Sequence, residues 1–387
     1  MTRCTTVEDQ IISTIIRNIF TAKSTIVENA VEVQLSNRFW IIYSQKGLRW
    51  IIPQNPNYGL PILTQWQPYD LSSRVKWQVL MTAYRLGQLG KLPGAIPIGI
   101  SDAATTSWQH FGYHNGEKLT PIIYIGTPGL TRKAVVFLVN LDNRELMGIG
   151  KIPLESMAGS KIIQEAENLV RLAGEKPGLA PNLLFIDRQS GVSLQSVIAG
   201  TPTGRKLTKA HIEWLYYLHI PGEEISLSKQ VKTLQQRLAN TRGIDEKMKS
   251  IFNRLWKIID DAKPLPSTWI HGDFAPWNLK WVVDQKIGAV DWEDARFNGL
   301  PLQDLCHYLY IQSYLFHTNT NVLDAIENHP IVLEYLKSLG IVGEISEKLV
   351  SFYLAETWIN SIEKGDFAYA AFLNTEMSKI LSLISVS

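Results

Sequence analysis

The sequence predicts an α+β fold, because a strand-rich middle section lies between an opening part of mixed character and a helical C-terminal part. In the middle section, short runs rich in Val, Ile and aromatic residues alternate with turns that contain Gly, Asn or Asp, which is typical of strands. Beyond residue 300 the pattern becomes helical and aromatic. The expected strands of the middle section are residues 121–125, 133–140, 146–152, 181–187 and 192–198.

The opening part, residues 1–115, has an α+β pattern of its own. Apolar residues recur at helical spacing over residues 7–21, and residues 72–89 predict a second helix. Residues 39–43 and 48–52 have strand character between these helices. No catalytic set is recognisable here, so a regulatory, partner-binding or substrate-capping module and a merely packed extension both remain open.

The composition limits the classes of function and partner that the protein can have. The 387 residues include 45% hydrophobic and 19% charged residues and carry a net charge of +2, so no nucleic acid or other polyanionic partner is implied. Cys4 and Cys306 show no metal-ligand spacing, which favours a reducing compartment. No apolar run approaches the ~20 residues needed to span a bilayer. We expect a cytoplasmic protein without a membrane partner.

The most informative stretch is TWIHGDFAPWNLKWVVDQKIGAVDWED, which begins at Thr268. Runs 279–283 and 286–290 predict a hairpin with a two-residue turn at Asp284 and Gln285. This register places Asn278 directly opposite Asp291 at the open end, with Cβ atoms roughly 5 Å apart. Asp273 lies on the loop that feeds the hairpin. Two carboxylates and an amide oxygen therefore converge, and oxygen donors of this kind suit Mg²⁺.

The same residues resemble a known family. The segment from His271 to Asn278, His-Gly-Asp-Phe-Ala-Pro-Trp-Asn, is similar to the H-G-D-x-x-x-x-N catalytic loop of the aminoglycoside phosphotransferase and choline kinase group, a counterpart of the protein-kinase loop. Asp291-Trp-Glu stands where protein kinases have D-F-G. The resemblance implies that Asp273 is catalytic and that Asn278 and Asp291 hold Mg²⁺. The alternative is a polar β-hairpin in an unrelated α+β protein.

The resemblance also implies a domain organisation. The fold would be protein-kinase-like and two-lobed, with a small β-rich N-lobe over residues 116–198 and a helical C-lobe over residues 199–387. The opening residues 1–115 would be an N-terminal extension outside the family pattern.

Nucleotide-binding residues follow from the same resemblance. Lys151 resembles the lysine that holds the nucleotide phosphates, although a surface lysine at a strand end is the alternative. Glu165 resembles its helical partner, and Glu167, two residues along the same helix, competes for this role. The turn from Gly126 to Gly129 would lie over the phosphates, because glycine lets backbone N–H groups approach closely.

Three further residues surround the expected loop. His271 looks catalytic, but the resemblance implies that it braces the loop backbone. Asp304 resembles a helical aspartate that accepts hydrogen bonds from the same loop. Glu293 is either a residue near the metal or an exposed neighbour, and the sequence leaves both open.

The resemblance implies a phosphotransferase that moves the γ-phosphoryl group of ATP or GTP, with Mg²⁺, to a hydroxyl of an amino sugar, sugar or amino alcohol. Residues 301–387 have a net charge of −6, which suits a cationic acceptor or simply solvates the helices. A nucleotide-binding pseudokinase that acts as a scaffold and a protein kinase-like enzyme remain alternatives. The sequence predicts no oligomeric state.

Overall fold

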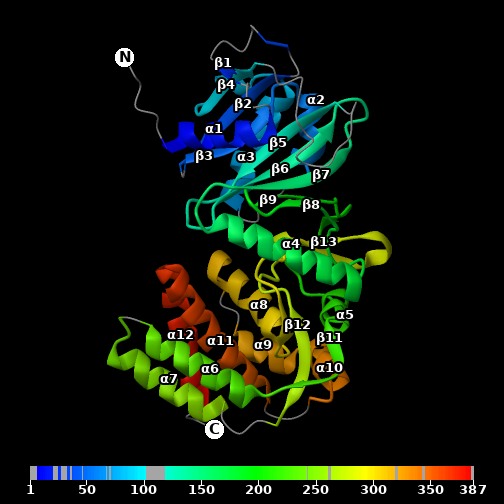
Figure 1. Cartoon of the computed structure of the whole chain (residues 1–387). Coiled ribbons are helices and arrows are strands. Elements are labelled where there is room, and N and C mark those ends of the chain that lie inside the picture. Colours follow the sequence, from blue (N-terminus) through cyan, green and yellow to red (C-terminus); the bar gives the residue numbers. More distant parts are fainter. Residues whose placement is uncertain are drawn as a thin grey trace. The chain divides into compact units, whose positions relative to one another are not determined.

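The structure is a computed structural model. This structure describes residues 7–20, 25–27, 33–34, 37–45, 47–66, 68, 71–101, 118–241, 243–259, 263–318, 321–341 and 345–384. The chain forms two compact units, Met1–Ala199 and Gly200–Ser387, which are described separately below. Figure 1 labels the elements of both units.

Unit 1 is built on a nine-stranded antiparallel sheet with the strand order β1-β4-β2-β3-β5-β6-β7-β9-β8. The five strands expected in the middle section correspond to β5 to β9. The opening part continues the same sheet, because β3 pairs with β5 and places Trp50 opposite Tyr124. The strands are β1 (Ile26–Val27), β2 (Arg38–Ser44), β3 (Gly47–Pro53), β4 (Ala95–Ile100), β5 (Leu119–Ile125), β6 (Lys133–Asn140), β7 (Leu146–Pro153), β8 (Leu183–Asp187) and β9 (Val192–Gln195).

Both faces of this sheet bury apolar side chains, because successive residues of a strand point to opposite faces. On one face, α1 (Val7–Ile19) contributes its isoleucine stripe to a cluster that includes Ile123 and Val136. On the other face, residues of α2 (Pro56–Leu63) and α3 (Leu71–Arg85) pack with Ile122 and Val139. The extension therefore shares its hydrophobic core with the expected N-lobe strands. Helix α4 (Ala158–Glu175) follows β7.

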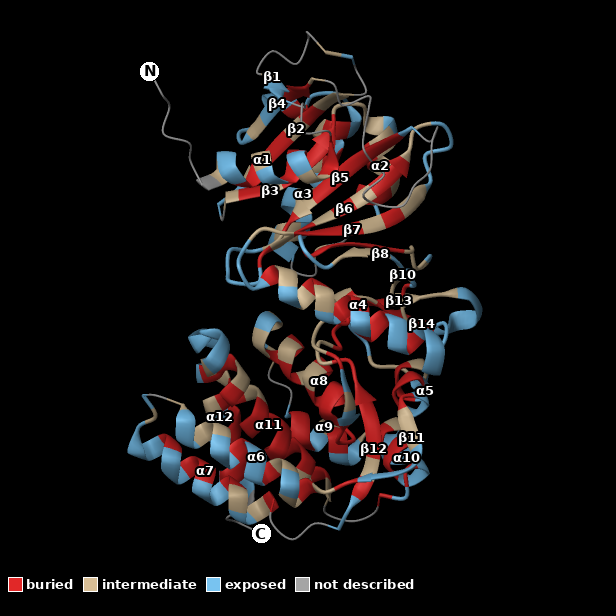
Figure 2. Cartoon of the chain, viewed as in Figure 1, coloured by how far each residue is buried: buried red, intermediate tan, exposed pale blue. Residues whose placement is uncertain are grey.

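Unit 2 is mainly helical. Its helices are α5 (Lys209–Tyr217), α6 (Leu227–Asn240), α7 (Glu246–Ile259), α8 (Gln303–Phe316), α9 (Val322–Asn328), α10 (Pro330–Ser338), α11 (Ile345–Lys364) and α12 (Phe367–Ile384). Figure 2 shows that α11 is buried over most of its length, which makes it the central helix of this unit. In the described part of the chain, no helix is both long and apolar enough to cross a membrane.

Two small antiparallel sheets complete unit 2 and position the stretch that the sequence singled out. One sheet has the order β10 (Thr201–Pro202), β13 (Leu279–Trp281) and β14 (Ile287–Ala289). The other has the order β11 (His219–Ile225), β12 (Leu265–Ile270) and β15 (Arg296–Gly299). The loop that begins at His271 leaves the end of β12 and enters β13. The predicted α+β class is confirmed.

Candidate active site

The loop after β12 has a fixed backbone. Gly272 has φ +86°, and a Cβ atom there would lie 2.4 Å from the carbonyl oxygen of Asp294, so only glycine fits. Asp304, on α8, accepts hydrogen bonds from the backbone N–H groups of His271 (2.7 Å) and Gly272 (3.0 Å). Burial raises the pKa of the Asp304 carboxyl, and these hydrogen bonds oppose that rise. The structure thus places Asp304 where it holds the loop, as the resemblance implied.

His271 is completely buried and braces the same loop. Its Nε2 lies 3.0 Å from the carbonyl oxygen of Val290, and its Nδ1 accepts from the N–H of Asp273 at 3.2 Å. Since a carbonyl only accepts, Nε2 carries the proton and the ring is neutral. Trp292 packs on the imidazole at a ring-centroid distance of 4.5 Å. Both nitrogens are therefore occupied by the backbone, which is a bracing role.

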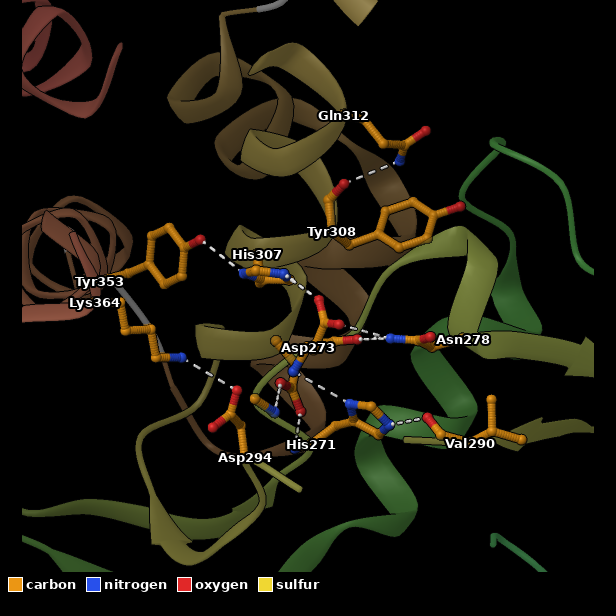
Figure 3. Close-up of polar contacts among 12 residues, drawn as sticks. His271, Asp273, Asn278, Val290, Asp294, His307, Tyr308, Gln312, Tyr353 and Lys364 are labelled. Atoms are coloured by element: carbon orange, nitrogen blue, oxygen red, sulfur yellow. Dashed lines mark hydrogen bonds and ion pairs between the residues drawn. The ribbon is translucent and has the colours of Figure 1, made fainter. Parts of the chain in front are cut away.

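The Asp273 carboxylate is held at both oxygens, as Figure 3 shows. Asn278 Nδ2 donates to Oδ2 at 2.8 Å and to the Asp273 carbonyl at 2.9 Å. His307 Nε2, from α8, lies 3.0 Å from Oδ1. The side chain keeps 35% of its surface exposed, so the carboxylate is fixed in direction and still reachable.

The surroundings of Asp273 keep it ionised. Burial alone would raise the pKa of this carboxyl, and the negative charge of Asp291 adds to that rise, but the hydrogen bond from His307 lowers the pKa below its ordinary value. A carboxylate with a lowered pKa carries its charge throughout the neutral range.

The predicted hairpin is present, but the predicted pairing of its strands is wrong by one residue. Leu279 pairs with Ala289 and Trp281 with Ile287, so a three-residue turn, Val283 to Gln285, replaces the two-residue turn. Asp284 and Gln285 both adopt left-handed backbone conformations, with φ +61° and +57°. This path adds one residue to the connection and shifts every cross-strand pair.

As a result, the residue opposite Asn278 is Val290, whose N–H donates to the Asn278 carbonyl at 2.9 Å. Asp291 follows one residue later, with a left-handed backbone at φ +68°. Such a conformation costs about 1 kcal/mol or more in a residue other than glycine and is enriched at functional sites. Asp291 lies close enough to Asp273 for its negative charge to raise the pKa of the Asp273 carboxyl.

The predicted metal site has oxygen donors of the right kind. Among the described residues, no group of three or more His, Cys, Asp or Glu side chains is arranged to hold a metal ion. Mg²⁺, however, is commonly bound through one or two carboxylates together with substrate phosphates. Both hydrogen bonds from Asn278 to Asp273 use Nδ2, so Oδ1 is the atom that a cation would contact. The donor set of Asn278 and Asp291 fits Mg²⁺ bound with a nucleotide.

In unit 1, Lys151 pairs with Glu165, the partner that the resemblance favoured over Glu167. Lys151 Nζ lies 2.6 Å from both carboxylate oxygens of Glu165, and the two residues are 5% and 0% exposed. Glu167 binds Arg188 at 2.7 Å on the surface instead. Lys151 is therefore not a surface lysine.

The glycine turn of unit 1, Gly126 to Gly129, lies in the connection between β5 and β6. The N–H of Gly126 donates to the carbonyl of Lys133 at 2.9 Å and closes the β5–β6 connection. It does not face a phosphate, because it is already bonded within the strands. Gly129 has open space around its Cα, and its carbonyl accepts from the N–H of Arg132 at 3.0 Å. Of the two glycines, only Gly129 keeps the predicted role open.

The burial of the Lys151–Glu165 pair has a measurable consequence. We expect Lys151→Ala to lower the free energy of unfolding by roughly 3–5 kcal/mol, because Glu165 would remain as an uncompensated buried charge. Arg188→Ala is the matched control: it breaks the exposed pair between Arg188 and Glu167 of α4, the helix that also carries Glu165, and should cost less than about 1 kcal/mol. Urea unfolding of both variants measures the difference. Equal, small losses would contradict the burial of Glu165.

His307 and Tyr353 are site residues that the sequence analysis missed. They line a cavity of about 290 Å³ within unit 2, to which Asp273 and Tyr369 also contribute. The one available signal was spacing: His307 lies three residues after Asp304 on α8, so both project to the same side of the helix. Tyr353 comes from α11, and no local pattern connects it to the loop.

Residues 210–328 match the model of the phosphotransferase enzyme family, and this segment contains the whole loop, Asp291, Asp304 and His307. Comparison with curated proteins finds no matching sequence. The resemblance stated from the sequence is confirmed by the family match.

Solved structures of similar fold include small-molecule kinases. A choline kinase from Streptococcus pneumoniae shares 14% identity at a TM-score of 0.45, over 65% of this chain and 89% of its own. An aminoglycoside phosphotransferase in complex with GDP and kanamycin shares 12% identity at a TM-score of 0.46, and the match covers 71% of this chain and 97% of that protein. A putative aminoglycoside phosphotransferase from Ralstonia eutropha shares 13% identity at a TM-score of 0.46, and the match covers 71% of this chain and 95% of that protein. All three TM-scores are below 0.5.

Proposed function

We propose, because residues 210–328 match the model of the phosphotransferase enzyme family, that the protein transfers the γ-phosphoryl group of ATP or GTP to a hydroxyl of a small acceptor. The observation that carries this proposal is the Asp273 carboxylate. It is ionised, held at both oxygens, placed in the wall of a cavity and located inside the matched segment.

Asp273 would act on the acceptor hydroxyl. Each carboxylate oxygen has a second lone pair, so it can accept a hydrogen bond from the acceptor while its bond to Asn278 or His307 persists. The acceptor oxygen forms a bond to the γ-phosphorus, and the bond from that phosphorus to the β–γ bridging oxygen breaks. The hydroxyl proton passes to Asp273, and the electron pair leaves with the nucleoside diphosphate.

The remaining polar residues would serve the nucleotide. Lys151 would bind its phosphates, with Glu165 fixing the direction of the ammonium group. Asn278 and Asp291 would hold Mg²⁺. When bound, this ion supplies positive charge that offsets the charge on the phosphates.

The cavity beside Asp273 supports a small, polar acceptor. Its charged walls are partly neutralised, since Arg296 binds Glu356 and Lys364 binds Asp294. Tyr369 is buried, and its hydroxyl makes no close hydrogen bond among the described residues, although the Tyr353 hydroxyl lies near it. A buried hydroxyl without a close hydrogen bond costs free energy that a hydroxyl or amine of a ligand can recover. An amino alcohol, sugar or amino sugar offers such groups.

An acceptor panel tests the proposal. Purified protein with Mg·ATP or Mg·GTP is mixed separately with amino alcohols, monosaccharides, amino sugars and aminoglycosides, and nucleoside diphosphate release is followed in a coupled assay. We expect at least one class to raise the rate well above hydrolysis alone. Tyr369→Phe should then raise KM for that acceptor and leave KM for the nucleotide unchanged. A rate that no acceptor changes would argue against the proposed function.

A further inference from the structure

Helix α8 carries two residues that act on the loop. Asp304 and His307 are nearly one helical turn apart and project to the same side. Asp304 accepts the backbone N–H groups of His271 and Gly272, whereas His307 contacts the side chain of Asp273 at 3.0 Å. One turn of α8 therefore fixes both the backbone of this loop and its carboxylate.

The direction of the His307 hydrogen bonds follows from the groups that it faces. An ionised carboxylate only accepts, so the Nε2–H of His307 donates to Oδ1 of Asp273. In the neutral ring, Nδ1 is then an acceptor, and the Tyr353 hydroxyl, 3.2 Å away, donates to it. Burial raises the pKa of Tyr353 well above its ordinary value, so this hydroxyl keeps its proton.

Packing prevents the imidazole from turning. The side chain of His307 is 15% exposed, and Tyr353 is 4% exposed. The ring of Tyr353 stacks on Tyr310 with centroids 5.7 Å apart and planes 12° apart. Rotation of the imidazole would break its bonds at both nitrogens, so its orientation is determined by α11 as well as by α8.

We propose that His307 is a positioning residue, fixed by Tyr353, which sets the direction in which Asp273 presents its carboxylate to the acceptor hydroxyl. The proposal rests on the proposed function, because it takes Asp273 as the group that faces the acceptor. Without His307, the carboxylate would be held only at Oδ2 by Asn278 and could rotate about its Cβ–Cγ bond. Small losses of orientation are costly in a reaction that depends on positioning.

The hydrogen-bond chain can be tested without any turnover. In protein labelled with ¹⁵N at histidine, long-range ¹⁵N–¹H spectra at neutral pH report which ring nitrogen of His307 carries the proton. His307→Gln identifies the signal. We expect a proton on Nε2 only, and we expect Tyr353→Phe to shift the Nδ1 resonance. Tyr310→Phe, which removes a neighbouring hydroxyl that does not contact His307, should leave it in place. A proton on Nδ1, or a signal indifferent to Tyr353→Phe, would overturn the proposal.

Kinetics test the consequence for Asp273. The reaction is Mg·ATP turnover with water as acceptor and then with the best acceptor of the panel. We expect His307→Leu to lower kcat by roughly 10- to 100-fold, the loss of one hydrogen bond to a charged group, while KM for ATP stays within a few-fold. His307→Gln keeps a donor near the position of Nε2 and should recover part of the loss. Tyr353→Phe should lower kcat several-fold, and Tyr310→Phe should not.

The two tests separate the proposals. If the wild-type protein turns over no ATP, the proposed function is wrong. The protonated ring nitrogen of His307 would still show whether the hydrogen bonds among Tyr353, His307 and Asp273 exist. If the wild type is active, a His307→Gln variant as slow as His307→Leu would show that the role is packing and not orientation. Should His307→Leu fail to fold, His307→Gln and Tyr353→Phe still provide both readouts.

Discussion

Asp273→Asn should lower phosphoryl transfer by a factor of ~10² to 10⁴ while Mg·ATP affinity stays within a few-fold. Asparagine preserves the size of the side chain and one oxygen, but it removes the negative charge and the basicity. The carboxylate contacts Asn278 and His307 and lines the cavity, so its loss affects the acceptor step. Steady-state kinetics and titration calorimetry on the same preparation measure both quantities.

Asp284→Asn is the matched control for this change. Asp284 lies in the exposed turn of the β13–β14 hairpin with φ +61°, a conformation that asparagine tolerates well. This control should leave turnover unchanged. An Asp273→Asn variant with normal turnover would exclude Asp273 from the mechanism, whereas one that loses nucleotide binding would identify it as a metal ligand.

Asp291→Asn should weaken the binding of Mg·ATP by roughly 10- to 100-fold and bring it to the level measured without Mg²⁺. Asn is preferable to Ala because the backbone at this position is left-handed, and alanine there would add strain. The charged oxygen is lost, while the fold and the hairpin should persist. Calorimetry with and without Mg²⁺, with Asp284→Asn as control, measures the effect. An unchanged difference between the two conditions would disprove the metal assignment.

The parts of the site that local sequence determines were predictable. The loop from His271 to Asn278 is one continuous segment, and the structure brings Asp273 and Asn278 into direct hydrogen-bond contact. Lys151 and Glu165 lie on adjacent elements, 14 residues apart, and their pairing was expected from the family resemblance. Glu167, the competing partner, pairs with Arg188 instead.

The errors have physical causes that local sequence does not show. Asp284 and Gln285 were expected to form a two-residue turn, but both are left-handed within a three-residue turn that contains no glycine, and Asn278 therefore faces Val290. His307 and Tyr353 meet only through tertiary packing, 46 residues apart. The pairing of β3 with β5, which joins the extension to the sheet, brings together Trp50 and Tyr124, 74 residues apart. Non-local contacts of this kind leave no periodic signal.

The most direct test of the central claim follows the γ-phosphoryl group itself. Wild-type protein is incubated with Mg²⁺ and ATP labelled with ¹⁸O in the γ-phosphoryl group, together with the acceptors of the panel, and the products are identified by ³¹P NMR and mass spectrometry. We predict that the labelled phosphoryl group appears as the phosphate monoester of a small hydroxylated acceptor, and that Asp273→Asn loses this product. Label found only in inorganic phosphate, only on protein side chains, or only in intact ATP would contradict small-molecule phosphoryl transfer.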